Sequence, residues 1–196
     1  MNLLPPRSRI LFLTGLLAVT PPVFAAAGHD PCPHGACFER EVRRGDTALL
    51  LRGFGTKRFW GFTVYDAALY LPADLGDPGK ALEPIPKKLV LRYHRDISRE
   101  DILRAAWHNL ENNPDLDLDA LRTRVEQLHS KFRNVKTHDR YALLFVPGQG
   151  TELLFNGTSE VVIPGDDFQR AYFGIWLSDR PISKKLKRDL FAWREK

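Results

Sequence analysis

The stretch LRGFGTKRFWGF, residues 51–62, lies between two segments that are rich in apolar and β-favouring residues. Its glycines, Gly53 and Gly55, are followed by Lys57 and Arg58, which raises the question of whether the stretch binds phosphate. A dinucleotide fingerprint needs G-x-G-x-x-G at the start of a helix, and a P-loop needs G-x-x-x-x-G-K-[ST]. The aromatic residues that come next favour a strand, so no helix N-terminus follows to bind an anion. The stretch therefore predicts a corner between two strands, and its two cations need another explanation.

The N-terminal segment has the pattern of a secretory signal peptide. Arg7 and Arg9 precede an apolar run, and Val23-Phe24-Ala25 resembles a signal peptidase site. The run is too short to span a bilayer stably, and no later run reaches spanning length. We therefore expect residues 1–25 to be removed and the mature protein to be periplasmic, without a membrane span. An uncleaved N-terminal anchor is the alternative.

The charge balance argues against nucleic acid as a partner. The chain has 196 residues and a formal net charge of +5, which falls to +3 when the signal segment and its two arginines are removed. Nucleic-acid-binding proteins concentrate a stronger positive charge on one face. The remaining length of about 170 residues suits one domain with one core. We expect this domain to cover residues 46–196, preceded by a leader at residues 26–45.

The leader contains both cysteines of the chain, Cys32 and Cys37. Their spacing allows a small disulfide loop in an oxidising compartment. The alternative is a soft-metal site formed by the two thiols with His29 and His34. That spacing matches no familiar zinc or haem pattern, so we expect a disulfide and no metal site.

The domain begins with strand-like segments. Residues 47–53 and 59–72 are rich in β-favouring residues, and residues 87–96 alternate apolar and polar side chains. Leu89 and Tyr93 lie on the same face of this third segment.

Two helices, a meander and two further helices follow. Ser98 is placed to cap the first helix, and an apolar stripe runs through residues 118–132 in the second. Residues 132–165 predict four short strands, with Asn156-Gly157 as the strongest hairpin signal. The last two helices begin near Asp166 and Ser183. This order predicts an α+β fold with helices layered on a largely antiparallel sheet.

Six short motifs occur in a fixed order between Thr47 and the C-terminus. They are Gly53-x-Gly55 with a cation next, FTVYDAALYLP, YHRDIS, FVPGQGTELLFNG, IPGDDF and IWLSDRPISKKLK. Together they resemble the exported bacterial branch of the chalcone isomerase family. The resemblance implies an open-faced β-sandwich, in which helices cover one face of a large antiparallel sheet and a ligand cleft lies between them.

The same resemblance implies a role for the two cations. Plant members of the family close a chalcone into a flavanone without a cofactor, and relatives without isomerase activity bind fatty acids. The family has an arginine two residues beyond the second glycine, where it holds the anionic part of the ligand. Lys57 stands at that position here, with Arg58 next to it. Strand alternation allows one of the two side chains to face the cleft.

The other polar groups of the family's catalytic site are not kept. The family's two threonines correspond to Tyr65 and Ile175 in this sequence. Its tyrosine corresponds to Ser98 or Arg99, and its asparagine corresponds to Ala105 or Ala106. A site without these groups loses much of the charge stabilisation that cyclisation requires. His94 and His108 could act as general bases, but neither has a nucleophile or metal partner at a recognisable spacing.

We therefore expect a chalcone isomerase-like protein that binds a small, apolar, anionic ligand such as a fatty acid, without a cofactor and without transforming it. The expected ligand-binding residues are Lys57, Arg58, Trp60, Tyr65, Ile175 and Trp176. One alternative is an intramolecular lyase or isomerase with a rebuilt site. Another is an envelope protein-interaction module that docks through the basic segment 180–196. We prefer to interpret that segment as an amphipathic helix that packs Leu186, Leu190 and Trp193 on the sheet.

Overall fold

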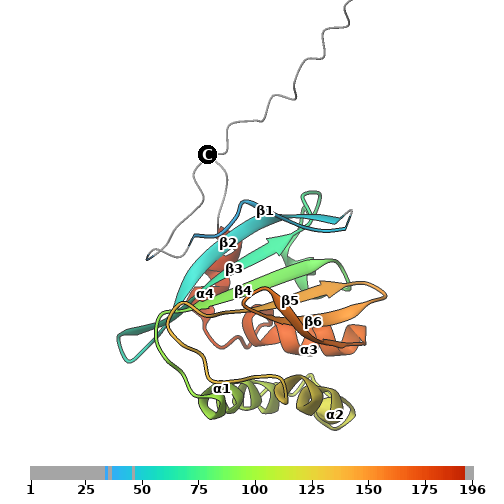
Figure 1. Ribbon diagram of the computed structural model, residues 1–196. Helices are drawn as coiled ribbons and strands as arrows, with labels where there is room; N and C mark the ends of the chain where they lie inside the picture. The colour runs from blue at the N-terminus through green and yellow to red at the C-terminus, as the bar shows by residue number, and fades with distance from the viewer. Residues whose placement is uncertain (1–33, 35–36, 46, 193–196) are drawn as a thin grey trace, which may run out of the picture.

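The computed structural model describes residues 34, 37–45 and 47–192, and within them the chain forms one sheet with helices on one side (Figure 1). The predicted signal segment, Cys32 and Trp193 lie outside the described residues. The sheet of the described residues has seven strands in chain order, each antiparallel to the next. They are β1 (Glu41–Arg44), β2 (Thr47–Phe59), β3 (Phe62–Leu71), β4 (Lys87–Tyr93), β5 (Arg140–Val146), β6 (Gly150–Phe155) and β7 (Thr158–Ile163).

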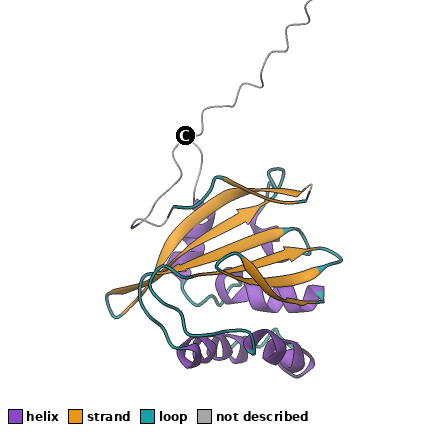
Figure 2. Cartoon of the chain, in the orientation of Figure 1, coloured by secondary structure: helices purple, strands orange, loops and turns teal. Residues whose placement is uncertain are grey.

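The four α-helices of the described residues occur as two pairs along the chain, and both pairs pack on one side of the sheet (Figure 2). Between β4 and β5 lie α1 (Arg99–Glu111) and α2 (Leu118–His129), and after β7 come α3 (Asp166–Leu177) and α4 (Lys184–Ala192). A short 3₁₀-helix, η2 (Pro78–Leu82), lies in the loop from β3 to β4. The predicted α+β fold, an antiparallel sheet with helices on one face, is confirmed.

Strand alternation gives the sheet two apolar faces. Ala67 and Leu69 of β3 pack in the main core with side chains of all four helices. Ala68 and Tyr70, the residues that alternate with them, pack in a smaller core on the opposite face. Phe38 of the leader is buried in this second core, so the leader covers part of the face that the helices leave open.

The predicted corner at Gly53 and Gly55 is wrong, because β2 continues through both glycines to Phe59. The chain turns instead at Trp60-Gly61, where both residues have positive φ, as a two-residue hairpin turn requires. The glycines allow α4 to pack closely on β2. A Cβ atom on Gly53 would lie 2.3 Å from the carbonyl oxygen of Leu190, and one on Gly55 would lie 2.6 Å from Cβ of Asp189.

The meander has one strand fewer than the sequence predicts. Residues 132–137 contribute a single bridge, between Ile97 and Val135, and no strand. The backbone N–H of Arg133 donates to the hydroxyl of Tyr141 instead of a neighbouring strand. The predicted hairpin turn at Asn156-Gly157 is confirmed, since both residues have positive φ between β6 and β7.

The predicted cap of the first helix and the predicted packing of the last helix agree with the structure. Ser98 caps α1, where its side chain accepts a hydrogen bond from the backbone N–H of Asp101 at 3.1 Å. Leu186 and Leu190 of α4 are buried in the main core, as expected of an amphipathic helix packed on the sheet. Among the described residues, no helix is long and apolar enough to cross a membrane.

Candidate functional site

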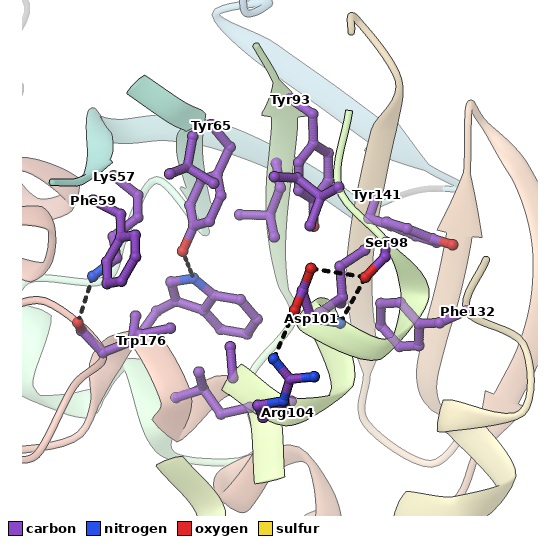
Figure 3. A pocket seen from close by; sticks show the side chains of 18 of the residues that line it. Lys57, Phe59, Tyr65, Tyr93, Ser98, Asp101, Arg104, Phe132, Tyr141 and Trp176 are labelled. Atoms are coloured by element: carbon purple, nitrogen blue, oxygen red, sulfur yellow. Dashed lines mark hydrogen bonds and ion pairs between the residues drawn. The ribbon is translucent and has the colours of Figure 1, made fainter. Parts of the chain in front are cut away.

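A cavity of about 910 Å³ lies between the helix-facing side of the sheet and helices α1 and α3 (Figure 3). The strands contribute side chains that alternate toward this face, such as Tyr65 of β3 and Tyr93 of β4. Ala106 of α1 and Trp176 of α3 line the opposite wall. The walls are mainly aliphatic and aromatic, so the interior suits an apolar ligand.

Lys57 lies on the wall of this cavity, near its edge. Its Nζ atom donates a hydrogen bond to the carbonyl oxygen of Ile182 at 3.0 Å, in the segment that leads into α4. Burial lowers the pKa of Lys57 from its ordinary value. A half-buried ammonium group of this kind is stabilised by an anion that replaces its lost hydration.

Arg58 does not line the cavity, and it is exposed. The pairing of β2 with β3 shifts between Lys57 and Arg58, so that Lys57 lies opposite Tyr65 and Arg58 lies opposite Thr63. Neighbouring residues of a strand point to opposite faces. The register therefore directs one cation of the pair toward the cavity.

Tyr65 and Trp176 form a polar contact inside the cavity. The Nε1–H group of Trp176 donates to the hydroxyl of Tyr65 at 3.0 Å. The ring of Tyr93 packs edge-to-face on that of Tyr65, with 5.8 Å between the ring centroids. Burial raises the pKa of both tyrosines. Their hydroxyls therefore stay protonated at neutral pH and can donate hydrogen bonds to a ligand.

The mouth of the cavity combines charged and aromatic side chains. Asp101 of α1 pairs with Arg104 at 2.8 Å, so part of this charge is neutralised (Figure 3). The guanidinium of Arg95 lies over the ring of Phe62, 5.2 Å from its centroid. Trp60, at the tip of the β2–β3 hairpin, is 85% exposed. The hairpin tip projects beyond the rest of the sheet (Figure 1), which places these aromatic groups at the entrance.

Five of the six expected ligand-binding residues line this one cavity. They are Lys57, Trp60, Tyr65, Ile175 and Trp176. Sequence reasoning missed Tyr93, Tyr141 and Tyr172, which also line it. The alternation of Leu89, Leu91 and Tyr93 could have indicated the first of these, because it already placed Tyr93 on an apolar face. No comparable signal existed for Tyr172, because it lies in the unbroken apolar run of residues 171–177, where no periodicity distinguishes one face from another.

The two histidines considered as general bases are separated by the sheet. His108 is exposed on α1 at the cavity mouth, where its Nδ1 atom lies 3.2 Å from Nδ2 of Asn112. His94 does not line the cavity, and its Nε2 atom lies 2.7 Å from a carboxylate oxygen of Asp66. The residues that line the cavity thus provide hydrogen-bond donors, the cation of Lys57 on the wall, and the charged groups of the mouth.

Comparison with known proteins connects this geometry to a family. The comparison with curated proteins gives no match. Among solved structures, the fold is similar to that of a fatty-acid binding protein from Arabidopsis thaliana, with a TM-score of 0.62 and 17% sequence identity over 80% of this chain and 92% of the plant chain. A family model described as chalcone isomerase-like matches residues 33–192. The chain therefore belongs to the chalcone isomerase-like family.

Proposed function

We propose that this protein is an exported member of the family that binds a fatty acid or a similar apolar carboxylate in the periplasm and does not transform it. The observation that carries this proposal is the position of Lys57, a half-buried cation on the wall of a cavity of about 910 Å³ whose walls are mainly aliphatic and aromatic and whose other charged side chains lie at its mouth. Ligand cavities of drug-sized molecules have volumes of about 300–1,000 Å³. The structural similarity to a plant fatty-acid binding protein supports the same class of ligand.

A carboxylate fits the surroundings of Lys57. The ammonium group uses one N–H bond for the carbonyl oxygen of Ile182, which leaves two for a ligand. A charge-assisted contact in a partly dry site contributes roughly 1.5–3 kcal/mol. The acyl chain would then extend along Tyr65, Ile175 and Trp176, where its burial contributes about 0.8 kcal/mol per methylene group. Head group and chain would thus be recognised by different parts of one cavity.

The experiment uses the pair of neighbouring cations as its own control. Lys57→Met and Arg58→Met each remove one positive charge, but Lys57 lines the cavity and Arg58 does not. We expect Lys57→Met to weaken the binding of hexadecanoate about tenfold or more, by the rule of 1.4 kcal/mol per decade. Arg58→Met should leave the affinity unchanged, and neither change should alter the affinity for hexadecanol. Isothermal titration of delipidated protein measures these affinities.

The proposal fails if neither variant changes the affinity for hexadecanoate, or if no fatty carboxylate binds to the wild-type protein. Mass spectrometry of small molecules that co-purify with the exported protein provides an independent identification of the ligand. We expect more apolar carboxylate to co-purify with the wild-type protein than with the Lys57→Met variant.

A lyase or isomerase with a rebuilt site is the second candidate, and a specific observation favours it. The hydroxyls of Tyr65 and Tyr93 are protonated groups on the cavity wall, and such groups can stabilise a developing enolate. Incubation with a chalcone separates the two functions. Our proposal expects flavanone to form no faster than in buffer. A rate well above buffer that falls in Tyr65→Phe and Tyr93→Phe would establish the enzyme instead.

A further inference from the structure

Three potential metal ligands meet on the sheet face opposite the cavity. They are His34 of the leader, Asp66 of β3 and His94, which follows β4. One ligand atom from each lies within 4.8 Å of the other two. The Nδ1 atom of His34 is 3.3 Å from Oδ1 of Asp66, and the Nε2 atom of His94 is 2.7 Å from Oδ2 of the same carboxylate. No part of the proposed carboxylate site is involved.

Asp66 is the centre of this cluster and is completely buried. The hydroxyl of Thr56, its partner across the β2–β3 pair, donates to Oδ1 at 2.6 Å. A buried carboxylate is costly unless a cation and hydrogen bonds compensate its charge. Among the described residues, the basic side chains that pair with Asp66 are the two histidines. Arg92 lies opposite Asp66 across the β3–β4 pair, but the direct contacts of the carboxylate are with the two imidazoles, so an ion held by all three ligands would compensate its charge at close range.

We propose that His34, Asp66 and His94 bind a divalent transition-metal ion of the Zn²⁺ type. Imidazole and carboxylate groups are usual ligands of zinc, and three protein ligands with water in the fourth position make a familiar open site. Zinc–ligand bonds of about 2.0–2.2 Å in a tetrahedron place neighbouring ligand atoms about 3.3–3.6 Å apart. The distance from His34 to Oδ1 of Asp66 lies at the lower end of this range, and the distance from His94 to Oδ2 would lengthen by about 0.6–0.9 Å on binding.

The exposure of the ligands agrees with an open site. The side chains of Asp66 and His94 are 0% and 13% exposed, whereas that of His34 is 44% exposed. The ion would therefore be reached from the His34 side, where a water molecule can complete its coordination. Thr56 would act as a positioning residue, because its hydrogen bond fixes the orientation of the Asp66 carboxylate.

The leader is held on the sheet close to His34. Phe38 is buried against the second core, and the carbonyl oxygen of Cys37 accepts a hydrogen bond from Arg140 at 3.1 Å. Cys37 is disulfide-bonded, so its sulfur is not a thiolate ligand and the alternative of a soft-metal site with thiols is wrong on this point. The predicted partner, Cys32, lies outside the described residues. A metal ion would add a further link between the leader and the sheet, through His34.

The test uses the metal alone as the probe. Protein dialysed against a chelator is titrated with Zn²⁺ by calorimetry, and Co²⁺ is added separately to record the visible absorption of a bound ion. His34→Asn removes one imidazole, and asparagine tolerates the positive φ of 47° found at this position. His94→Gln removes the other. His108→Gln is the matched control, because it removes an exposed histidine on the helix side.

We expect one Zn²⁺ per chain, a loss of at least tenfold in affinity in His34→Asn and in His94→Gln, and no loss in His108→Gln. The Co²⁺ absorption should disappear in the first two variants and persist in the third. Because His34 is exposed, its variant should fold even if His94→Gln does not. The proposal is overturned if the wild-type protein binds no stoichiometric Zn²⁺, or if His34→Asn binds it as tightly as wild type. In that outcome the histidines are structural ion-pair partners of Asp66.

Discussion

Replacement of Gly53 by alanine tests the interpretation that the glycines of β2 exist for the packing of α4. The added Cβ atom would lie 2.3 Å from the carbonyl oxygen of Leu190 and 2.5 Å from that of Asp189. Both neighbours are backbone atoms of a helix, so no side chain can rotate to make room. Carbon contacts are favourable at about 3.5–4.0 Å, and α4 must therefore retreat from β2 by roughly 1 Å.

The size of the stability loss in Gly53→Ala follows from the buried side chains that hold α4 against the sheet. Leu186 and Leu190 are 1% and 0% exposed, and complete loss of such a side chain costs about 2–5 kcal/mol. A retreat of roughly 1 Å forfeits about a quarter to a half of the dispersion energy at each contact. The gain from replacing glycine inside a strand is about 0.5–1 kcal/mol. The net effect is a decrease of about 2 kcal/mol in the free energy of unfolding, which lowers the melting temperature by about 4–8 °C in a domain of this size.

Denaturant unfolding measures this loss, and Gly76→Ala provides the matched control. Gly76 is exposed in the loop between β3 and β4, and a Cβ atom there would meet nothing within 4 Å. Its replacement should change the free energy of unfolding by less than about 0.5 kcal/mol. The packing argument is refuted if Gly53→Ala is as stable as Gly76→Ala.

Three further predictions concern buried charge and export. Burial lowers the pKa of Lys87 to about 7. The unfolded chain keeps the proton of Lys87 up to the ordinary lysine pKa of about 10.4, whereas the folded chain has lost it above about pH 7. The free energy of unfolding should therefore rise between about pH 8 and 10. Lys87→Met should remove about 1 kcal/mol of this rise per pH unit, as measured by urea titrations. Burial lowers the pKa of His129 to about 4, so acidification from about pH 6.5 to 4.5 should destabilise wild type by about 1 kcal/mol per unit relative to His129→Gln. Equal pH slopes in a variant and wild type would contradict the corresponding assignment. N-terminal sequencing of the exported protein should begin at Ala26 to within about two residues, whereas an intact Met1 on a cytosolic product would contradict export.

Local patterns predicted the parts of the fold that depend on neighbours in sequence. The cap at Ser98 and the turn at Asn156-Gly157 follow from the conformations that a few consecutive residues favour, and the structure has both. Alternation along β4 likewise placed Leu89 and Tyr93 on one face, and both line the cavity. Such features need no knowledge of distant contacts.

The features that sequence reasoning missed depend on residues far apart in the chain. Gly53 and Gly55 have the composition of a turn, and their true role requires α4, which begins at Lys184. The cluster on the other face joins His34 and His94 to Asp66, and each histidine is about 30 residues away along the chain. No local pattern carries this information, because the pairing register of the whole sheet decides which of these side chains meet.

The register of the β2–β3 pair, and one irregularity in it, determine both proposed sites. Leu51 pairs with Tyr70 on the second face, but the pairing shifts at Arg52, so that Gly53 pairs with Leu69 on the helix face. A β-bulge of this kind inverts the facing of every residue that follows it. Without it, Lys57 would point away from the cavity, and Thr56 would point away from Asp66.

The bulge itself is anchored outside the pair. The guanidinium of Arg52 donates to the carbonyl oxygens of Pro72 at 2.5 Å and Ala73 at 2.9 Å, beyond the end of β3. These bonds hold the extra residue where the strand leaves its regular pairing. Further along the same pair, Lys57 lies opposite Tyr65 and Thr56 lies opposite Asp66. Since consecutive residues of a strand face opposite sides, one register supplies the cavity with its cation and the opposite face with its buried carboxylate.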